Sequence, residues 1–284
     1  MTRFIYIADT HFGTSRMAYQ QQQGYPEKLG SILSELDAWI RKDGEVDFVL
    51  HGGDMVNSAT EANIRKARGA FRLSVPVYLC LGNHDLTAPD AVDMWLAEAP
   101  EFFPGKSPDY CLRFGDSIIH IVPNHWEEVP YYWNDKQEPH FRPHQIARLN
   151  ESLRKYPDAV HLLSTHSPVF GIPVEQTGFG EAFHVPPPSF TRTVLDFVQQ
   201  YPRVRCVLAA HNHVNTHVVE EGVHFVTVSS LSETPFEFRL IELGPGILKM
   251  STVSLISRMD FEAKYDYNKT FVQGRKRDRE FEEL

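Results

Sequence analysis

The chain has 284 residues, of which 42% are hydrophobic and 23% charged, and its formal net charge is −9. These proportions are those of an ordinary globular protein and exclude extensive disorder, and no apolar run approaches the ~20 residues that cross a bilayer. Because binding to long nucleic acid relies on clustered Lys and Arg, the acidic balance disfavours that partner and favours a small phosphorylated substrate.

The first part of the chain alternates apolar strand-like runs with amphipathic helical patterns. A helix is predicted between Pro26 and Gly44, because apolar residues recur there at helical spacing. Thr60 can cap a second helix over Glu61–Leu73. The strands before, between and after these helices are predicted at 5–8, 46–50 and 75–81. This β-α-β-α-β order predicts a largely parallel sheet.

The second part begins with a hairpin around Gly115 and continues with a helix over Pro143–Lys155, where the proline suits the first turn. A strand leading to His166, a helix over Thr191–Gln200 and a strand leading to His211 follow. Beyond these the period changes to two, which predicts strands at 217–219, 223–228, 236–242 and 247–253. We expect one α/β domain over residues 1–259, with two packed sheets and outer helices. A charged tail over 260–284 packs as an arm or frays.

Three cysteines, Cys80, Cys111 and Cys206, lie in apolar strand-like runs, and an odd number forms no closed disulfide set. We interpret all three as small buried hydrophobic residues in a reducing compartment. The strand-like run Phe4–Ile7 begins almost at Met1, which leaves no space for a signal peptide. We therefore expect a cytoplasmic protein without a membrane segment; its oligomeric state stays open.

Five of the predicted strands end in side chains that can bind a metal. Any one of them alone would be a turn residue or a structural histidine, and His51, His120, His161 and His224, which fall within strands, are interpreted as structural. Ligands of α/β sheets bind beyond the carboxyl ends of the strands, so the joint pattern predicts one site with two metal ions. A mixed His and carboxylate site without cysteine favours Mn, Fe or Zn. The candidate ligands are Asp9, His11, Asp54, Asn83, His166, His211 and His213.

Over roughly residues 3–243 the sequence resembles the calcineurin-like metallophosphoesterase family. The family's blocks occur in order: Asp9-Thr10-His11, Gly53-Asp54, Gly82-Asn83-His84-Asp85, His166 after an apolar strand, and His211-Asn212-His213. The resemblance implies a four-layer α/β/β/α sandwich with two mixed sheets. It implies that Asp54 bridges two ions, with Asp9, His11 and His213 on one and Asn83, His166 and His211 on the other.

The implied activity is hydrolysis of a phosphodiester or phosphomonoester by a hydroxide that bridges the two ions. His84, which is not needed as a ligand, would contact the phosphoryl group together with Asn83 or protonate the leaving group. The family often has Asp as the partner of this histidine, where this chain has Asn57. A neutral partner stabilises imidazolium less than a carboxylate does, so His84 is expected to be a weaker proton donor. The Gly that usually precedes the last His-x-His is Ala210.

Several alternatives stay open at this level. The single-domain size looks like the bacterial cyclic-nucleotide phosphodiesterase branch, but neighbouring branches hydrolyse nucleotide pyrophosphates. A DNA exonuclease of the same family would need a basic groove, and a metal-retaining binding scaffold would need no catalytic His84. Substrate choice is expected to come from three loops: Trp126–Trp133, Ser167–Phe190 with His184, and Ser229–Phe236.

Overall fold

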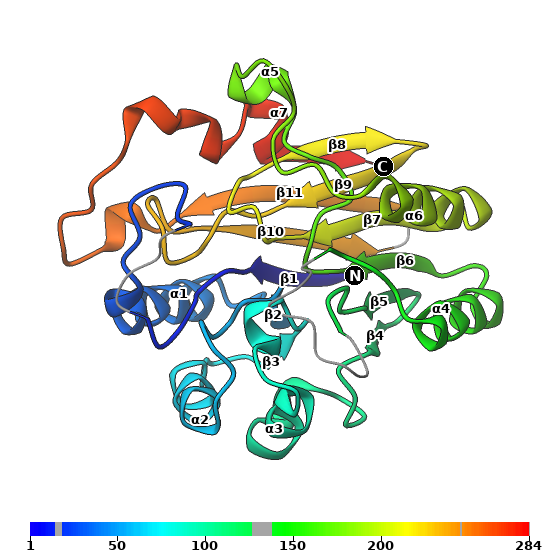
Figure 1. Cartoon of the computed structure of the whole chain (residues 1–284), viewed down its shortest axis with the longest axis horizontal. Helices are drawn as coiled ribbons and strands as arrows, with labels where there is room; N and C mark the ends of the chain where they lie inside the picture. Colours follow the sequence, from blue (N-terminus) through cyan, green and yellow to red (C-terminus); the bar gives the residue numbers. More distant parts are fainter. Residues whose placement is uncertain (15–18, 127–137, 245, 284) are drawn as a thin grey trace.

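The computed structural model describes residues 1–14, 19–126, 138–244 and 246–283, and in it two six-stranded sheets face each other (Figure 1). The first sheet has the order β12-β11-β10-β1-β2-β3. Its strands β1, β2 and β3 run parallel, whereas β10, β11 and β12 pair antiparallel. The bounds are β1 Thr2–Ile7, β2 Phe48–His51, β3 Val77–Leu79, β10 Glu237–Gly244, β11 Ile247–Ser254 and β12 Glu280–Glu283.

The second sheet has the order β4-β5-β6-β7-β9-β8. Its central strands β5, β6, β7 and β9 are parallel, and an antiparallel strand closes each edge. Both sheets are therefore mixed, as predicted. The bounds are β4 Tyr110–Phe114, β5 Ser117–Ile121, β6 Val160–Ser164, β7 Val204–Ala209, β8 His217–Glu220 and β9 Val223–Thr227.

Helices cover the outer faces of the two sheets (Figure 1). On the first sheet, α1 buries Ile32, Leu36 and Ile40 in the main apolar core, which also fills the space between the sheets. On the second sheet, Leu149 of α4 and Val194 of α6 pack in a separate cluster. The predicted four-layer sandwich is thus confirmed. The helices are α1 Leu29–Asp43, α2 Glu61–Ala70, α3 Ala91–Glu98, α4 Pro143–Lys155, α5 Val174–Thr177, α6 Pro188–Gln200 and α7 Lys276–Arg279, with short 3-10 turns at Pro26–Lys28, His84–Leu86, Pro100–Phe102, Ile256–Arg258 and Tyr267–Gln273.

The prediction that all three cysteines are buried is wrong for Cys111. Cys80 and Cys206 are buried, but Cys111 is exposed. Cys111 lies on the edge strand β4, where successive side chains alternate between the faces, so Tyr110 and Leu112 point inward and the thiol between them points to solvent.

The charged segment after Asp260 ends as a strand of the first sheet, because β12 pairs antiparallel with β11. From β12, Phe281 stacks on the rings of His217 in β8 and His224 in β9, with ring centroids 4.5 Å and 4.1 Å away. The segment therefore touches both sheets. Within the described part of the chain, no helix combines the length and the apolar character needed to cross a bilayer.

Candidate metal centre

The carboxyl ends of five strands meet at one place and bring all seven candidate ligands together. Asp9 and His11 follow β1, Asp54 follows β2 and Asn83 follows β3, all in the first sheet. From the second sheet, His166 follows β6, and His211 and His213 follow β7. Six of the seven side chains are buried, and His211 is half-buried.

One half of the cluster consists of Asp9, His11 and His213, whose ligand atoms all lie within 4.8 Å of one another. The Nε2 atoms of His11 and His213 are 3.3 Å apart. Nε2 of His213 is 3.7 Å from Asp9 Oδ1, and Nε2 of His11 is 3.8 Å from Asp54 Oδ2. We refer to these three residues as the first half of the centre.

The second half consists of Asn83, His166 and His211. Asn83 Oδ1 lies 3.0 Å from both His166 Nε2 and His211 Nδ1. The same carboxylate oxygen of Asp54 that faces His11 is 3.3 Å from His166 Nε2. Asp54 thus lies between the halves, where the family resemblance implies a bridging ligand.

The hydrogen bonds made by the outer nitrogens of two histidines turn their inner nitrogens towards the cluster. Nδ1 of His213 lies 2.5 Å from a Glu233 carboxylate oxygen, and Nδ1 of His166 lies 2.9 Å from the Gly52 carbonyl. Those nitrogens must donate, so each ring turns Nε2 towards the cluster. Burial opposes protonation of the two rings, but Asp54 beside His166 and Asp9 beside His213 outweigh it and raise each pKa to about 9, so in the protein alone the Nε2 atoms hold protons that a bound metal ion would replace. Asp9 Oδ1 is also buried, with no hydrogen-bond partner among the described residues. Buried carboxylates and imidazoles arranged in this way require cations between them, either protons or metal ions, and a mixed His and carboxylate donor set of this kind fits two metal ions.

The ionisation of the two aspartates agrees with this assignment. Burial raises the pKa of Asp9 to about 7, although His213 and His166 act in the opposite direction. Burial also opposes ionisation of Asp54, but His166 and His84 outweigh it and hold the pKa of Asp54 well below its usual value. The protein alone therefore leaves the Asp9 anion poorly stabilised, which is the condition that a bound cation relieves.

Five of the seven ligands adopt a left-handed backbone conformation. The φ angles are 53° at Asp9, 46° at His11, 55° at Asp54, 69° at His211 and 55° at His213. Such angles are strained for residues other than glycine, by about 1–3 kcal/mol each, and concentrate at functional sites. Ala210, where the family usually has Gly, lies outside this set, so its added methyl group meets no such restriction.

Two glycines are required by the close approach of the loops. A Cβ at Gly53 would lie 2.3 Å from His166 Nδ1, and Gly53 itself has a φ of 112°. A Cβ at Gly82 would lie 2.3 Å from Asp54 Oδ1 and 2.5 Å from its backbone nitrogen. The glycines of the Gly53-Asp54 and Gly82-Asn83 motifs thus allow the loops after β2 and β3 to touch.

His84 lies beside the centre, but its contact with Asn57 differs from the expected one. His84 Nδ1 is 2.9 Å from the main-chain carbonyl of Asn57, and the His84 amide donates to Asp54 Oδ1 over 2.7 Å. The Asn57 side chain instead accepts a 2.5 Å hydrogen bond from the Tyr19 hydroxyl, which is also 3.0 Å from His11 Nδ1. The contact with Asn57 that orients the ring is thus made by its main-chain carbonyl, and the expectation that Asn in place of Asp makes His84 a weaker proton donor stays a prediction.

Of the three loops expected to choose the substrate, one has another role. Residues 229–236 are all buried, and this segment supports the ligands: Ser230 Oγ donates to the Asp9 carbonyl over 2.6 Å, and Glu233 bonds His213. Most of Trp126–Trp133 lies outside the described residues. The Ser167–Phe190 loop does reach the centre, because His184 and the ligand His211 line the same hollow of about 190 Å³.

Sequence reasoning missed Tyr19, Asn124 and Glu233. Asn124 Oδ1 accepts from the amides of His166 and Ser167 over 3.1 and 3.0 Å and so fixes the loop after β6. None of these residues belongs to a sequence motif. They are identified by their hydrogen bonds to the candidate ligands in the structure.

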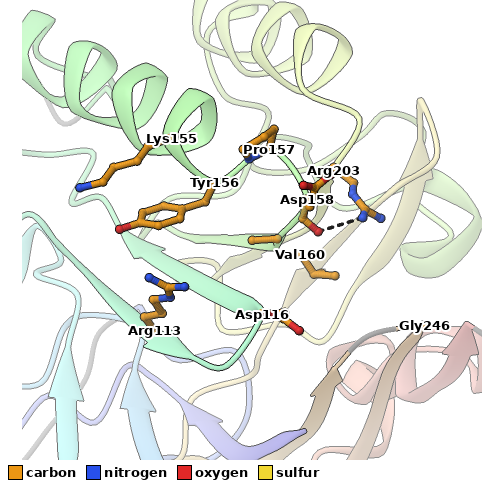
Figure 2. Close-up of a pocket in the computed structure, with 10 residues that line it drawn as sticks. Arg113, Asp116, Lys155, Tyr156, Pro157, Asp158, Val160, Arg203 and Gly246 are labelled. Atoms are coloured by element: carbon orange, nitrogen blue, oxygen red, sulfur yellow. Dashed lines mark hydrogen bonds between the residues drawn. The ribbon is translucent and has the colours of Figure 1, made fainter.

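A larger hollow, of about 460 Å³, lies elsewhere (Figure 2). It is lined by residues at the amino ends of β6 and β7, among them Val160 and Arg203, whose guanidinium donates to the Asp158 carbonyl over 2.8 Å. The candidate ligands follow the opposite, carboxyl ends of these strands. This hollow therefore takes no part in the metal centre.

Comparison with known proteins agrees with the fold and the motifs. A search of curated proteins finds no sequence relative. Among solved structures, a dimetal phosphatase from Danio rerio has a TM-score of 0.69 at 15% identity, covering 89% of this chain and 96% of that one. An anchor protein of the inner membrane complex of Plasmodium has a TM-score of 0.61 at 12% identity, covering 89% and 84%. At these identities the likeness shows the fold alone. The sequence model of calcineurin-like phosphoesterases, however, matches residues 2–215, and the chain therefore belongs to the calcineurin-like phosphoesterase family.

Proposed function

We propose that this protein is a two-metal phosphoester hydrolase that acts on a small phosphorylated substrate. The observation that carries the proposal is the meeting of seven N and O donors in two groups that share Asp54. When bound, two divalent or trivalent cations such as Mn, Fe or Zn would clamp phosphoryl oxygens and lower the pKa of a bound water towards neutrality.

The chain's own residues supply the rest of the chemistry. The Asn57 carbonyl fixes the His84 ring through Nδ1, so the proton that His84 can give to a leaving oxygen is the one on Nε2. A ring nitrogen of His84 lies within 4.8 Å of ligand atoms of His11 and Asp54. We therefore assign to His84 the role of proton donor and phosphoryl contact, and to Asn83 that of ligand and second phosphoryl contact. Asn57 acts through its main-chain carbonyl.

The hollow beside His211 supports a small leaving group. Its volume of about 190 Å³ is below the ~300–1,000 Å³ of pockets that enclose a drug-sized ligand. Ser167, His184 and Glu138 provide polar atoms, and five lining residues are apolar: Pro139, Pro168, Val185, Pro186 and Pro187. His184, with a φ of 52°, is held in a left-handed conformation like the ligands. We propose that His184 contacts the part of the substrate that leaves.

The choice among diester, monoester and pyrophosphate is a matter for experiment. Protein loaded separately with Mn²⁺, Fe²⁺ and Zn²⁺ would be assayed against an aryl phosphodiester, an aryl phosphomonoester, cyclic nucleotides and dinucleotide pyrophosphates. We expect turnover of at least one class that a chelator abolishes and that Asp54→Asn loses. Protein that holds two ions and hydrolyses none of these would refute the hydrolase and support the binding scaffold.

A further inference from the structure

A buried carboxylate outside the seven ligands lies behind the first half of the centre. Glu233 is in the loop between β9 and β10, and only 1% of it is exposed. Burying an ionised carboxylate is costly unless hydrogen bonds satisfy it. The bonds that Glu233 makes therefore indicate why the chain keeps it there.

Each carboxylate oxygen of Glu233 has a distinct task. Oε2 accepts from the backbone amides of Gln21 and Gln22 over 2.9 and 2.7 Å, which fixes the carboxylate against the segment that carries Tyr19. Oε1 lies 2.5 Å from Nδ1 of His213. Nδ1 of His213 points away from the cluster. Its bond with Glu233 keeps a proton on Nδ1 and turns Nε2 of the same ring towards Asp9.

Two other histidines of the centre, His166 and His11, have neutral groups in the corresponding position. Nδ1 of His166 faces the Gly52 carbonyl, and Nδ1 of His11 faces the Tyr19 hydroxyl. A carboxylate behind a ligating imidazole raises its basicity more than a neutral acceptor does, and loss of such a partner typically weakens metal binding 10–100-fold. The two halves are therefore supported unequally.

We propose that Glu233 is a positioning residue that makes the first half of the centre, Asp9, His11 and His213, the tighter of the two metal sites. This inference rests on the proposed function, since it concerns the same two ions. It adds that the sites load in order, first half before second, and that the order is set by a residue that touches neither ion.

The test compares Glu233→Gln with Glu237→Gln in the full chain. Glu237 is an equally buried carboxylate in β10, but it bonds Asn215 and Arg279 rather than a ligand. Co²⁺ binding would be measured by competition with a chromogenic chelator, which resolves two dissociation constants. We expect Glu233→Gln to weaken the tighter constant about 10–100-fold and to leave the weaker one unchanged, whereas Glu237→Gln leaves both unchanged.

Equal constants in Glu233→Gln and wild type, or an equal shift of both constants, would overturn the inference while the wild type still binds two ions. A wild type that binds no Co²⁺ would overturn the proposed function as well. If Glu233→Gln does not fold, Glu233→Asp retains the charge on a side chain shorter by one methylene. We expect Glu233→Asp to weaken the tighter constant alone, by less than the Gln variant would; an unchanged tighter constant in a folded Glu233→Asp protein would count against the proposal.

Discussion

His84 is the residue to which we assign the proton transfer, as distinct from metal binding. It is half-buried, its amide bonds the bridging Asp54 and its ring bonds the Asn57 carbonyl. The seven ligands are complete without it. Its removal should therefore affect the proton transfer and spare the ions, which separates the two functions in one variant.

We predict that His84→Ala lowers kcat about 10²–10⁴-fold, the usual contribution of a positioned general acid, while two ions per chain are retained. Turnover and metal content would be measured on the same preparation. Unchanged turnover would remove His84 from the mechanism, and loss of an ion would make it a ligand instead.

At the scale of elements, the loops after the strands are as constrained as the strands themselves. The loop after β3 passes so close to Asp54 that no side chain fits at Gly82. By contrast, Gly69 in α2 has no atom within 4 Å of an added Cβ. The same substitution at these two glycines therefore has different consequences.

We predict that Gly82→Ala yields a folded protein that binds fewer than two ions, because the new methyl group would lie 2.3 Å from Asp54 Oδ1 and displace the bridging carboxylate. Gly69→Ala should keep both ions and raise the free energy of unfolding by up to about 1 kcal/mol, since Ala is the better helix former. Metal analysis and urea unfolding of both variants test this; full metal content in Gly82→Ala would contradict it.

Helix α2 offers a second test, remote from the chemistry. Thr60 Oγ1 accepts from the Asn63 amide over 3.2 Å and so caps the helix, as its sequence predicts. Thr60→Ala should lower the free energy of unfolding by about 1 kcal/mol, and Thr60→Ser should change it by much less. Equal midpoints of urea unfolding for all three proteins would show that the cap contributes nothing.

At the scale of elements, the sequence predicts the features that depend on residues close together in the chain. Helix α4 begins and ends where expected, at Pro143 and Lys155, because a proline in the first turn and the Gln145 bond to the Arg142 amide are short-range signals. The motifs likewise locate the candidate ligands, because each motif follows its own strand. Helix ends were less exact: α2 stops at Ala70 rather than Leu73, and α6 starts at Pro188 rather than Thr191.

What could not be predicted depends on contacts between distant parts of the chain. Gln22 and Glu233 are 211 residues apart in the sequence. No local pattern indicates that the Glu233 carboxylate accepts a hydrogen bond from the Gln22 amide. The outward direction of Cys111 follows from the position of β4 at the sheet edge, which is a property of the sheet order. The ligand strain likewise arises only when five loops must meet.

At the scale of the whole molecule, the segment after Asp260 connects loops that are far apart in the sequence. Gln22 Nε2 donates to the carbonyls of Asp266 and Lys269 over 3.0 and 3.1 Å, and the Asn215 amide donates to Val272 over 2.9 Å. Further along, Asp278 is fully buried and accepts from the His217 amide over 3.0 Å. The segment thus holds both the loop behind Glu233 and the chain just after His213.

Histidines that are buried in the neutral form make the stability of this fold depend on pH, and His51 is the clearest example. The Gly53 amide donates to Nδ1 over 3.2 Å, and Nε2 is 3.0 Å from the Thr10 hydroxyl, so the neutral ring already has both partners. Burial lowers the pKa of His51 to about 3. The unfolded chain, with an ordinary pKa of about 6.5, therefore gains a proton between pH 6.5 and 3 that the folded protein cannot take up.

We predict that His51 has no effect on the pH dependence of stability above pH 6.5 and lowers the free energy of unfolding below it, by up to about 1.4 kcal/mol per pH unit. His51→Asn, which loses one of the two bonds, should be less stable at pH 8. Because Asn does not titrate, the gap between the two proteins should narrow as the pH falls towards 5. Urea unfolding from pH 8 to pH 5, with the same metal ion present for both proteins, measures this gap. Parallel curves would mean that the folded protein accommodates the imidazolium, and that the two hydrogen bonds do not fix the neutral ring.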